Sequence, residues 1–247
     1  MVSKSQIKLI RSLHQKKQRH AESLFIAEGF KVITELLQSR FKLVQLYVTE
    51  DIFSEVQSIH RVLISASELE KISALTTPSN CLAVFEIPSD SQPRFAGLVV
   101  ALDDIRDPGN LGTIIRLCDW FGIQEIICSE ETADIYNPKV VQASMGSLAR
   151  VHVHYVNLEQ VLSATSLKLF GTFMDGNNIY QLDLPQEGIV VFGNEANGIS
   201  DNISALIKNK ITIPRFGEIQ KTESLNVATA TAIILSEFRR SASVSGM

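Results

Sequence analysis

Short apolar runs alternate with amphipathic segments along most of the chain. The runs 97-GLVVAL-102 and 188-GIVVFG-193 are apolar at nearly every position, which suits parallel strands that are covered on both faces. Residues 4–13 and 27–38 instead repeat apolar positions at the spacing of a helix. Because strands and helices alternate, the pattern predicts an α/β fold. No run approaches the ~20 apolar residues that a membrane-spanning helix needs.

The stretch 87-IPSDSQPRFAG-97 lacks the apolar content of a helix or strand and is the best candidate for a linker. It divides the chain into residues 1–90, for which we expect a small α/β/α sandwich, and residues 96–240, for which we expect a parallel sheet. We expect the tail 241–247 to be disordered. The predicted strands are 43–48, 61–64 and 81–87, followed by 97–102, 124–128, 151–156, 168–173, 188–193 and 210–213. The predicted helices are 4–13, 27–38 and 67–74, followed by 111–121, 138–145, 157–165, 199–208 and 223–240.

The net charge of −4 hides an asymmetry between the two ends of the chain. Residues 1–45 hold nine Lys or Arg and three acidic residues, whereas residues 96–247 hold eleven basic and seventeen acidic residues. A basic segment on an otherwise acidic protein favours a local contact with a polyanion. A solvated helix face explains the same charges equally well.

The three cysteines, Cys81, Cys118 and Cys128, are odd in number and show no CxxC spacing. This pattern favours buried free thiols in a reducing cytosol over a disulfide framework. His152 and His154 alternate in 151-VHVHYV-156 and share one face of a predicted strand. No cysteine or carboxylate stands at a suitable sequence spacing from them, so we expect no metal site.

A polar turn follows the predicted strand 97–102. Asp103 and Asp104 precede 106-RDPGNLG-112, which leads into a helix, and such strand-to-helix turns can bind anions. The fingerprints GxGxxG and GxxxxGK[ST] are both absent, which weakens the nicotinamide and nucleoside-triphosphate interpretations. On its own, Asn110 suits an ordinary helix N-cap.

A second loop, 193-GNEANG-198, follows the predicted strand 188–193. Its two glycines permit positive φ angles and a close approach of the backbone to a ligand. Glu195 stands at a strand end, where parallel sheets place their ligand crevice. The alternative is a loop carboxylate that caps helix 199–208.

In a third segment, Pro214 ends a strand and 224-SLNVA-228 opens a helix that is rich in small residues. Capping explains one of Ser224 and Asn226 better than it explains both.

The three segments, in their order and spacing, resemble the motifs of the SpoU (TrmH) family of RNA ribose 2′-O-methyltransferases, within the SPOUT superfamily. They are 102-LDDIRDPGNLGTIIRLCDWFG-122, 190-VVFGNEANGIS-200 and 211-ITIPRFGEIQKTESLNVATATAIILSEF-238. The resemblance implies a C-terminal parallel-sheet domain with a deep trefoil knot, S-adenosylmethionine as cofactor and a homodimer. The stretch 17-KQRHAESLFIAEGFKVITELL-37 resembles the family's N-terminal domain, which is related to a ribosomal RNA-binding protein fold. The RNA-binding domain would then be residues 1–90, and the methyltransferase domain residues 96–240.

The resemblance also assigns roles to single residues. Arg116 stands at the place of the family's catalytic arginine, Asn110 helps to order the site, and Glu195 holds Asn110 or Arg116 in position. Ser224 and Asn226 complete the catalytic set. Contacts with the cofactor fall to Gly193, Ile213 and Leu225, mostly through backbone groups, with Thr172 as a weaker candidate.

The sequence departs from the family in the charged loop 215–223, because many members have a shorter Gly/Ser-rich loop there. Arg215 and Lys221 in this loop either touch RNA phosphates or are only solvated.

The reaction that the resemblance implies is transfer of a methyl group from S-adenosylmethionine to a ribose 2′-OH in structured RNA. We expect the substrate to be ribosomal RNA rather than tRNA, and not DNA, since only RNA offers the 2′-OH. We also expect a cytoplasmic enzyme that uses no metal and binds no membrane. A guanidinium is always protonated, so Arg116 suits phosphate binding and alkoxide stabilisation better than proton removal. The alternatives are a non-catalytic RNA-binding protein that retains the fold, a tRNA ribose methyltransferase, a base methylase of the same superfamily, and an unknotted doubly wound nucleotide enzyme.

Overall fold

The computed structural model describes residues 2–89, 91–217 and 224–240. The chain forms two compact units. The first combines the chain up to Asp90 with Asp134–Arg150, and the second combines Ser91–Ala133 with the chain from Val151 onward. The sequence predicts the same two-part division but places 134–150 with the C-terminal part. The assignment of one function to residues 1–90 and another to 96–240 stays a prediction.

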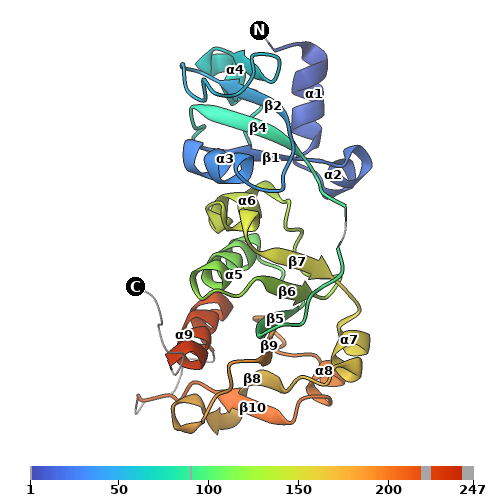
Figure 1. The fold of residues 1–247 in the computed structure, drawn as a ribbon, viewed down its shortest axis with the longest axis vertical. Helices are drawn as coiled ribbons and strands as arrows, with labels where there is room; N and C mark the ends of the chain where they lie inside the picture. The colour runs from blue at the N-terminus through green and yellow to red at the C-terminus, as the bar shows by residue number, and fades with distance from the viewer. Residues whose placement is uncertain (1, 90, 218–223, 241–247) are drawn as a thin grey trace. The chain divides into compact units, whose positions relative to one another are not determined.

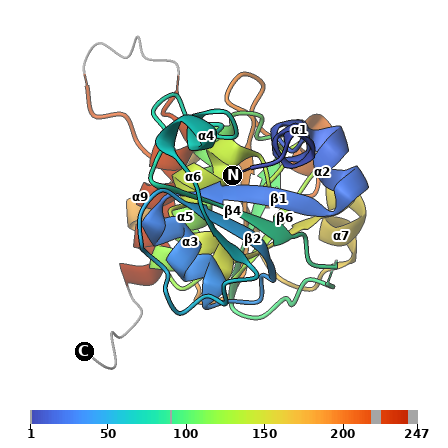
Figure 2. The same ribbon diagram turned by 90° about the horizontal axis from the view of Figure 1, so that it is seen from above.

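The first unit is built on a four-stranded mixed sheet of order β1-β4-β2-β3 (Figure 2). Its strands are β1 (Leu24–Glu28), β2 (Leu43–Val48), β3 (Arg61–Leu63) and β4 (Cys81–Glu86). Its helices are α1 (Lys4–Ser12), α2 (Lys16–Glu22), α3 (Phe30–Leu37), α4 (Ala66–Glu70) and α6 (Pro138–Ser144), with the short 3-10 helix η1 (Ser147–Ala149). Strand β4 is antiparallel to both of its neighbours, and β3 is parallel to β2.

Helices cover both faces of this sheet, which confirms the α/β/α prediction. Ile10 on α1 and Leu69 on α4 belong to the core on the face that carries Ile26 of β1. Phe25, the next residue along β1, points to the opposite face, because side chains alternate along a strand. Its ring packs against Tyr136, with 4.8 Å between the ring centroids. The segment 134–150 therefore completes the second helical layer of the first unit.

A buried ion pair holds this segment in place. Arg19 on α2 is only 1% exposed, and its Nε donates to Oδ2 of Asp134 at 2.9 Å. A second guanidinium nitrogen donates to the backbone oxygen of Leu13 at 2.8 Å. Because a buried charge is costly without a partner, each member of the pair requires the other.

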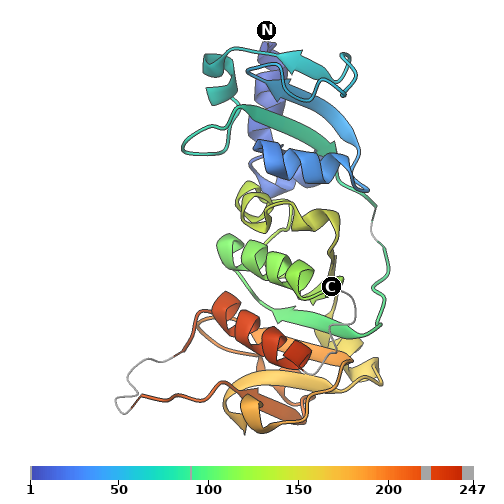
Figure 3. The same ribbon diagram turned by 60° about the vertical axis from the view of Figure 1, so that its left-hand side comes forward.

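The second unit is a six-stranded sheet, with every strand parallel to its neighbours, of order β10-β8-β9-β5-β6-β7 (Figure 1). Its strands are β5 (Leu98–Asp103), β6 (Glu125–Cys128), β7 (His152–Tyr155), β8 (Leu169–Asn178), β9 (Gly188–Gly193) and β10 (Asn209–Thr212). Its helices are α5 (Pro108–Trp120), α7 (Leu158–Ala164), α8 (Asp201–Ser204) and α9 (Val227–Arg240), with the 3-10 helix η2 (Ile179–Gln181). Helices α5 and α9 lie side by side on one face of the sheet (Figure 3), and α7 and α8 cover the other.

The strand order places a topological switch point next to the site motifs. From β5 the chain moves outward through β6 and β7, then crosses to the other side of the sheet for β8, β9 and β10. In such sheets the ligand crevice lies at the carboxyl ends of the strands near the switch point. Here those ends carry Asp103 on β5 and Gly193 on β9.

Several element boundaries differ from the sequence prediction. Strand β1 and helix α2 were not predicted, and residues 27–28 belong to β1 because Gly29, with φ of +89°, separates the strand from α3. Helices α4 and α8 are shorter than predicted, and α9 begins at Val227. In the described part of the linker 87–97 no helix or strand is present, as predicted. Residues 218–223 and 241–247 lie outside the described residues, and the trefoil knot stays a prediction.

None of the helices in the described part of the chain combines the length with the apolar composition that a membrane span requires.

Candidate active site

Three side chains from distant segments form one hydrogen-bonded chain beside the ends of β5 and β9. Oδ1 of Asn226 accepts from the backbone N–H groups of Ala228 at 3.0 Å and Thr229 at 3.2 Å, so this asparagine caps α9. Its Nδ2 therefore donates to Oδ1 of Asn110, at 2.9 Å. Nδ2 of Asn110 then donates to Oε1 of Glu195, at 2.6 Å. The contact between Glu195 and Asn110 that the family resemblance implies is present.

The capping alternatives for Asn110 and Glu195 are wrong. Asp107 is the N-cap of α5, and its Oδ1 accepts from the backbone N–H of Asn110 at 2.8 Å. Pro108 follows at the first helical position, where its fixed φ is favourable. The N-cap position of α8 is Ser200, not Glu195. Both side chains are thus available for the hydrogen-bonded chain rather than used to end a helix.

The loop after β9 is folded back so tightly that Gly193 has no room for a side chain. A Cβ at Gly193 would lie 2.2 Å from the backbone carbon of Gly198, a distance that real atoms do not show. Gly198 has φ of +71°, and its backbone exchanges two hydrogen bonds with Asn194. Nδ2 of Asn194 also donates to the carbonyl oxygen of Asp104 at 2.7 Å. The loop is therefore tied both to itself and to the end of β5.

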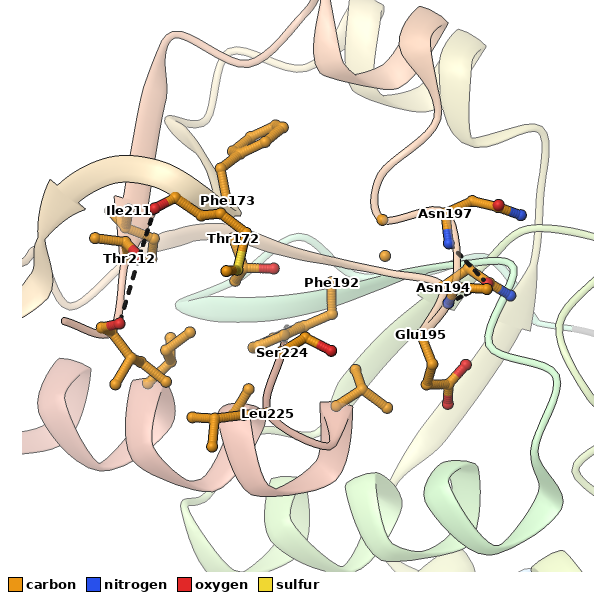
Figure 4. Close-up of a pocket in the computed structure, with 18 of the residues that line it drawn as sticks. Thr172, Phe173, Phe192, Asn194, Glu195, Asn197, Ile211, Thr212, Ser224 and Leu225 are labelled. Carbon is orange, nitrogen blue, oxygen red and sulfur yellow. Dashed lines mark hydrogen bonds between the residues drawn. The ribbon is translucent and has the colours of Figure 1, made fainter. Parts of the chain in front are cut away.

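A pocket of about 870 Å³ opens at this edge of the sheet (Figure 4). Asn194 and Glu195 lie at one end of it and Ile211 and Thr212 at the other, with Leu225 on the side of α9. Of the residues that the resemblance assigns to the site, six line the pocket: Thr172, Gly193, Glu195, Ile213, Ser224 and Leu225. Their roles stay predictions.

Within one chain, Arg116 does not lie with the predicted site residues that line the pocket. It is exposed on α5 and is absent from the pocket wall, about 9 Å further along the helix than Asn110 and on a different side of it. Among the described residues it makes no hydrogen bond or ion pair. Its predicted catalytic role stays a prediction.

The sequence interpretation missed Asn194, which is only 9% exposed and fixes the shape of the pocket loop. Its Oδ1 accepts from the backbone N–H of Ala196 at 2.8 Å. A signal was available, because an asparagine between a strand-ending glycine and a glutamate suits an Asx turn. The sequence places Asp103 at a strand end but does not reveal its contact with Ser200. Its Oδ2 accepts from both the backbone N–H and the hydroxyl of Ser200, at 2.8 and 2.7 Å.

The described cysteines are buried and unpaired, as predicted. Burial raises the pKa of the Cys118 and Cys128 thiols well above the ordinary value and that of Cys81 to about 11. These thiols are therefore protonated at neutral pH and are poor nucleophiles.

His154 meets Oε2 of Glu125 through its Nε2, at 2.7 Å, and its Nδ1 lies 2.9 Å from the backbone oxygen of Ser91. The carboxylate partner stands on the neighbouring strand β6, which sequence spacing does not reveal. In the described ranges no group of three or more metal-ligating side chains is present.

A doubly wound parallel sheet with a pocket at the carboxyl ends of its central strands defines an α/β protein that binds a small organic ligand. The chain belongs to the SpoU rRNA methylase family, whose model matches residues 97–236. Residues 4–83 match a second model, described as an MRM3-like substrate binding domain.

Individual relatives agree with this assignment over nearly the whole chain. The chain is 30% identical to the 23S rRNA (guanosine(2553)-2′-O)-methyltransferase RlmP of Bacillus subtilis, over 93% of this chain and 94% of that protein. A putative RNA methyltransferase of the TrmH family from Porphyromonas gingivalis is 39% identical with a TM-score of 0.89, covering 97% of this chain and 99% of that one. An AdoMet-bound rRNA methyltransferase from Sinorhizobium meliloti is 28% identical with a TM-score of 0.85, over 97% of both chains.

Proposed function

We propose that this protein transfers a methyl group from S-adenosylmethionine to a ribose 2′-OH in structured ribosomal RNA. The observation that carries the proposal is the Asn226–Asn110–Glu195 chain of hydrogen bonds at the end of the large pocket, in a member of the SpoU family. Ribosomal RNA is preferred as substrate because RlmP, a 23S rRNA methyltransferase, is similar to this chain along both units rather than along the second unit alone.

S-adenosylmethionine is the cofactor, and the residues of the pocket fit it. The volume of about 870 Å³ is in the range of small-molecule sites. Apolar side chains such as Phe192, Val227 and Ile234 offer a surface for a purine ring, and the backbones of Gly193 and Ile213 offer polar groups. When bound, the cofactor supplies an electrophilic methyl group on a sulfonium. The protein must orient the ribose oxygen in line with that methyl group.

Arg116 is proposed to bind the phosphate next to the target ribose and to stabilise the oxygen as it becomes an alkoxide. The family resemblance implies a homodimer with the site near its interface, where Arg116 would act beside groups of the other subunit. Trp120, four residues further along α5, is 83% exposed and shares a helix face with Arg116. A homodimer would cover this apolar ring, which supports the proposed dimer without fixing its geometry.

The first unit is proposed to bind the RNA. Its match to a substrate binding domain and the excess of basic residues over 1–45 both support this role. Affinity should then fall steeply with salt concentration, because phosphate contacts release counterions. The buried free thiols are consistent with the proposed location in the reducing cytoplasm.

The test is transfer of tritium from labelled S-adenosylmethionine to separate pools of unmodified ribosomal RNA and tRNA. Label should enter ribosomal RNA and survive alkali as a dinucleotide, because a methylated 2′-oxygen cannot attack the adjacent phosphate. Arg116→Ala should abolish the label, and Arg116→Lys should restore little of it, since a point charge lacks the guanidinium fork.

Label confined to tRNA would overturn the ribosomal substrate. Absence of both label and cofactor binding would favour the non-catalytic RNA-binding alternative. Near-normal turnover of Arg116→Lys would refute a specific guanidinium role.

A further inference from the structure

Two aromatic rings are left exposed beside the pocket, on segments far apart in the sequence. Tyr180 lies on η2, after β8, and Phe216 lies beyond β10. Their ring centroids are 6.5 Å apart and their planes are inclined by 31°. Tyr180 is 42% exposed and Phe216 is 84% exposed, so neither ring belongs to the hydrophobic core.

The rings adjoin the wall of the pocket that we assign to the methyl donor. Arg215, the residue before Phe216, lines this pocket together with Met174, and its Nη2 lies 3.8 Å from the Met174 sulfur. Met174 belongs to β8, the strand that leads into η2. The backbone N–H of Tyr180 is held by Oδ1 of Asn178 at 3.0 Å, which fixes where this residue sits on its turn.

Positive charge accompanies the rings. Arg215 lies next to Phe216 in the chain. Lys210 on β10 lies over the ring of Phe173, with its Nζ 4.6 Å from the ring centroid, but it also pairs with Asp175 at 4.0 Å, which offsets part of its charge. Phe173 also lines the pocket. Exposed aromatic rings next to cationic side chains are the combination with which proteins hold unpaired nucleotides, through base stacking and phosphate contacts.

We infer that Tyr180 and Phe216 form a stacking platform for an unpaired nucleobase of the RNA substrate, with Arg215 beside it. The inference rests on the proposed function, because it takes the adjoining pocket as the methyl donor's site. A ribose whose 2′-OH reaches that pocket carries its base on the neighbouring ring carbon. The two rings border the end of the pocket that holds Ile211 and Thr212, opposite Glu195, so they would stack a base next to the target nucleotide rather than the target's own base.

The alternative occupant of the same rings is a second copy of this chain, for which they would supply apolar contact area. The two occupants differ in what they require of residue 216. A protein contact accepts another large aliphatic side chain, whereas base stacking needs a flat π-face. Phe216→Leu therefore separates the two, with Phe216→Tyr as the conservative variant that keeps the ring.

The first experiment measures methyl transfer to unmodified ribosomal RNA with wild-type protein, Phe216→Leu, Phe216→Tyr and Tyr180→Ala. We expect the KM for RNA to rise about tenfold in Phe216→Leu and Tyr180→Ala, as loss of one base stack implies, and to stay near wild type in Phe216→Tyr. Affinity for S-adenosylmethionine, measured by calorimetry, should be unchanged in all of them. The matched control is Phe95→Leu, since Phe95 is also exposed but precedes the central strand β5, at the amino ends of the strands, whereas Tyr180 and Phe216 follow carboxyl ends.

The second experiment uses a short single-stranded RNA that carries one 2-aminopurine, whose fluorescence is quenched on stacking. Quenching by wild-type protein that is lost in Phe216→Leu supports the platform independently of turnover. Wild-type KM together with wild-type quenching in Phe216→Leu would overturn it. So would a change from dimer to monomer in Phe216→Ala by sedimentation, which would assign the ring to a protein contact. Failure of methyl transfer by the wild-type protein, with quenching intact, would instead refute the proposed function alone.

Discussion

The role of the Asn226–Asn110–Glu195 hydrogen bonds can be tested by replacing the donor group of Asn110 with an acceptor. In Asn110→Asp, the Nδ2 that donates to Glu195 at 2.6 Å is replaced by an oxygen, so two carboxylates face each other. The variant loses a hydrogen bond to a charged group, worth roughly 1.5–3 kcal/mol. It also gains a repulsion of about 1 kcal/mol in a water-like dielectric. Because Glu195 is exposed and can turn away, which relieves much of the repulsion, we take about 2 kcal/mol as the free energy by which Asn110→Asp disfavours the native arrangement.

About 2 kcal/mol corresponds to a population change of roughly 30-fold, since 1.4 kcal/mol is tenfold. We therefore expect kcat/KM for RNA methylation to fall at least about tenfold in Asn110→Asp. The double variant Asn110→Asp/Glu195→Gln should recover much of the thermal stability and cofactor affinity. Its glutamine can donate to the new aspartate, which still accepts from Asn226. The assays are calorimetry with S-adenosylmethionine, thermal unfolding and tritium transfer on all four members of the cycle.

Glu195→Gln alone separates charge from geometry, because its amide oxygen can still accept from Asn110. If the double variant recovers cofactor affinity but not turnover, the negative charge itself is needed. The reasoning is refuted if Asn110→Asp keeps wild-type affinity and turnover, or if the double variant is no better than Asn110→Asp.

Three further predictions concern packing and pH. Gly193→Ala should weaken S-adenosylmethionine binding at least about tenfold by calorimetry, because its Cβ would lie 2.2 Å from backbone; unchanged affinity would contradict the tight loop. Arg19→Met should lower the free energy of unfolding in urea by roughly 3–5 kcal/mol, because it leaves the buried carboxylate of Asp134 without its cation. A loss below about 1 kcal/mol would mean that the ion pair is not buried in solution. Hydrogen bonds from the backbone, above all from Ser65, lower the pKa of Glu68 from 4.5 to about 2. The ionised Glu68 therefore stabilises the folded state above pH 4.5, and this stabilisation is lost as the pH falls toward 2. Glu68→Gln should flatten the pH dependence of unfolding in that window, and an unchanged slope would count against the lowered pKa.

The second unit follows its sequence closely, because its strands are apolar on both faces and its turns carry local signals. Five of the six described strands of that sheet begin and end within one or two residues of their predicted bounds, whereas β8 runs to Asn178, five residues beyond its predicted end. The secondary structure of the first unit is harder to predict from the sequence. Residues 24–28 form a strand, although the helical spacing beyond Gly29 extends back over part of them. Only the positive φ of Gly29 separates the two elements, and a sequence does not display it.

Site residues could be predicted from the sequence where the residue type alone restricts the chemistry, as for Glu195 at a strand end. The sequence was misleading where two neighbours could fill one structural role. Asp107 and Asn110 are both good N-caps, and only the helix start decides that Asp107 takes the cap and leaves Asn110 to the site. Contacts across more than a hundred residues, such as that between Asn110 and Asn226, follow from the topology and not from local spacing.

The placement of residues 134–150 in the first unit has a consequence for the order in which the protein is made. Arg19 leaves the ribosome 115 residues before Asp134, which at about 5–20 residues per second is a wait of roughly 6–23 s. During that time the face of β1 that carries Phe25 lacks the cover of α6. Meanwhile β5 and β6 emerge without β8, β9 and β10, so neither unit can finish folding before synthesis of the other is under way. The nascent chain therefore passes through a stage in which the hydrophobic cores of both units are incomplete and exposed to solvent. Protection by chaperones matters most at this stage.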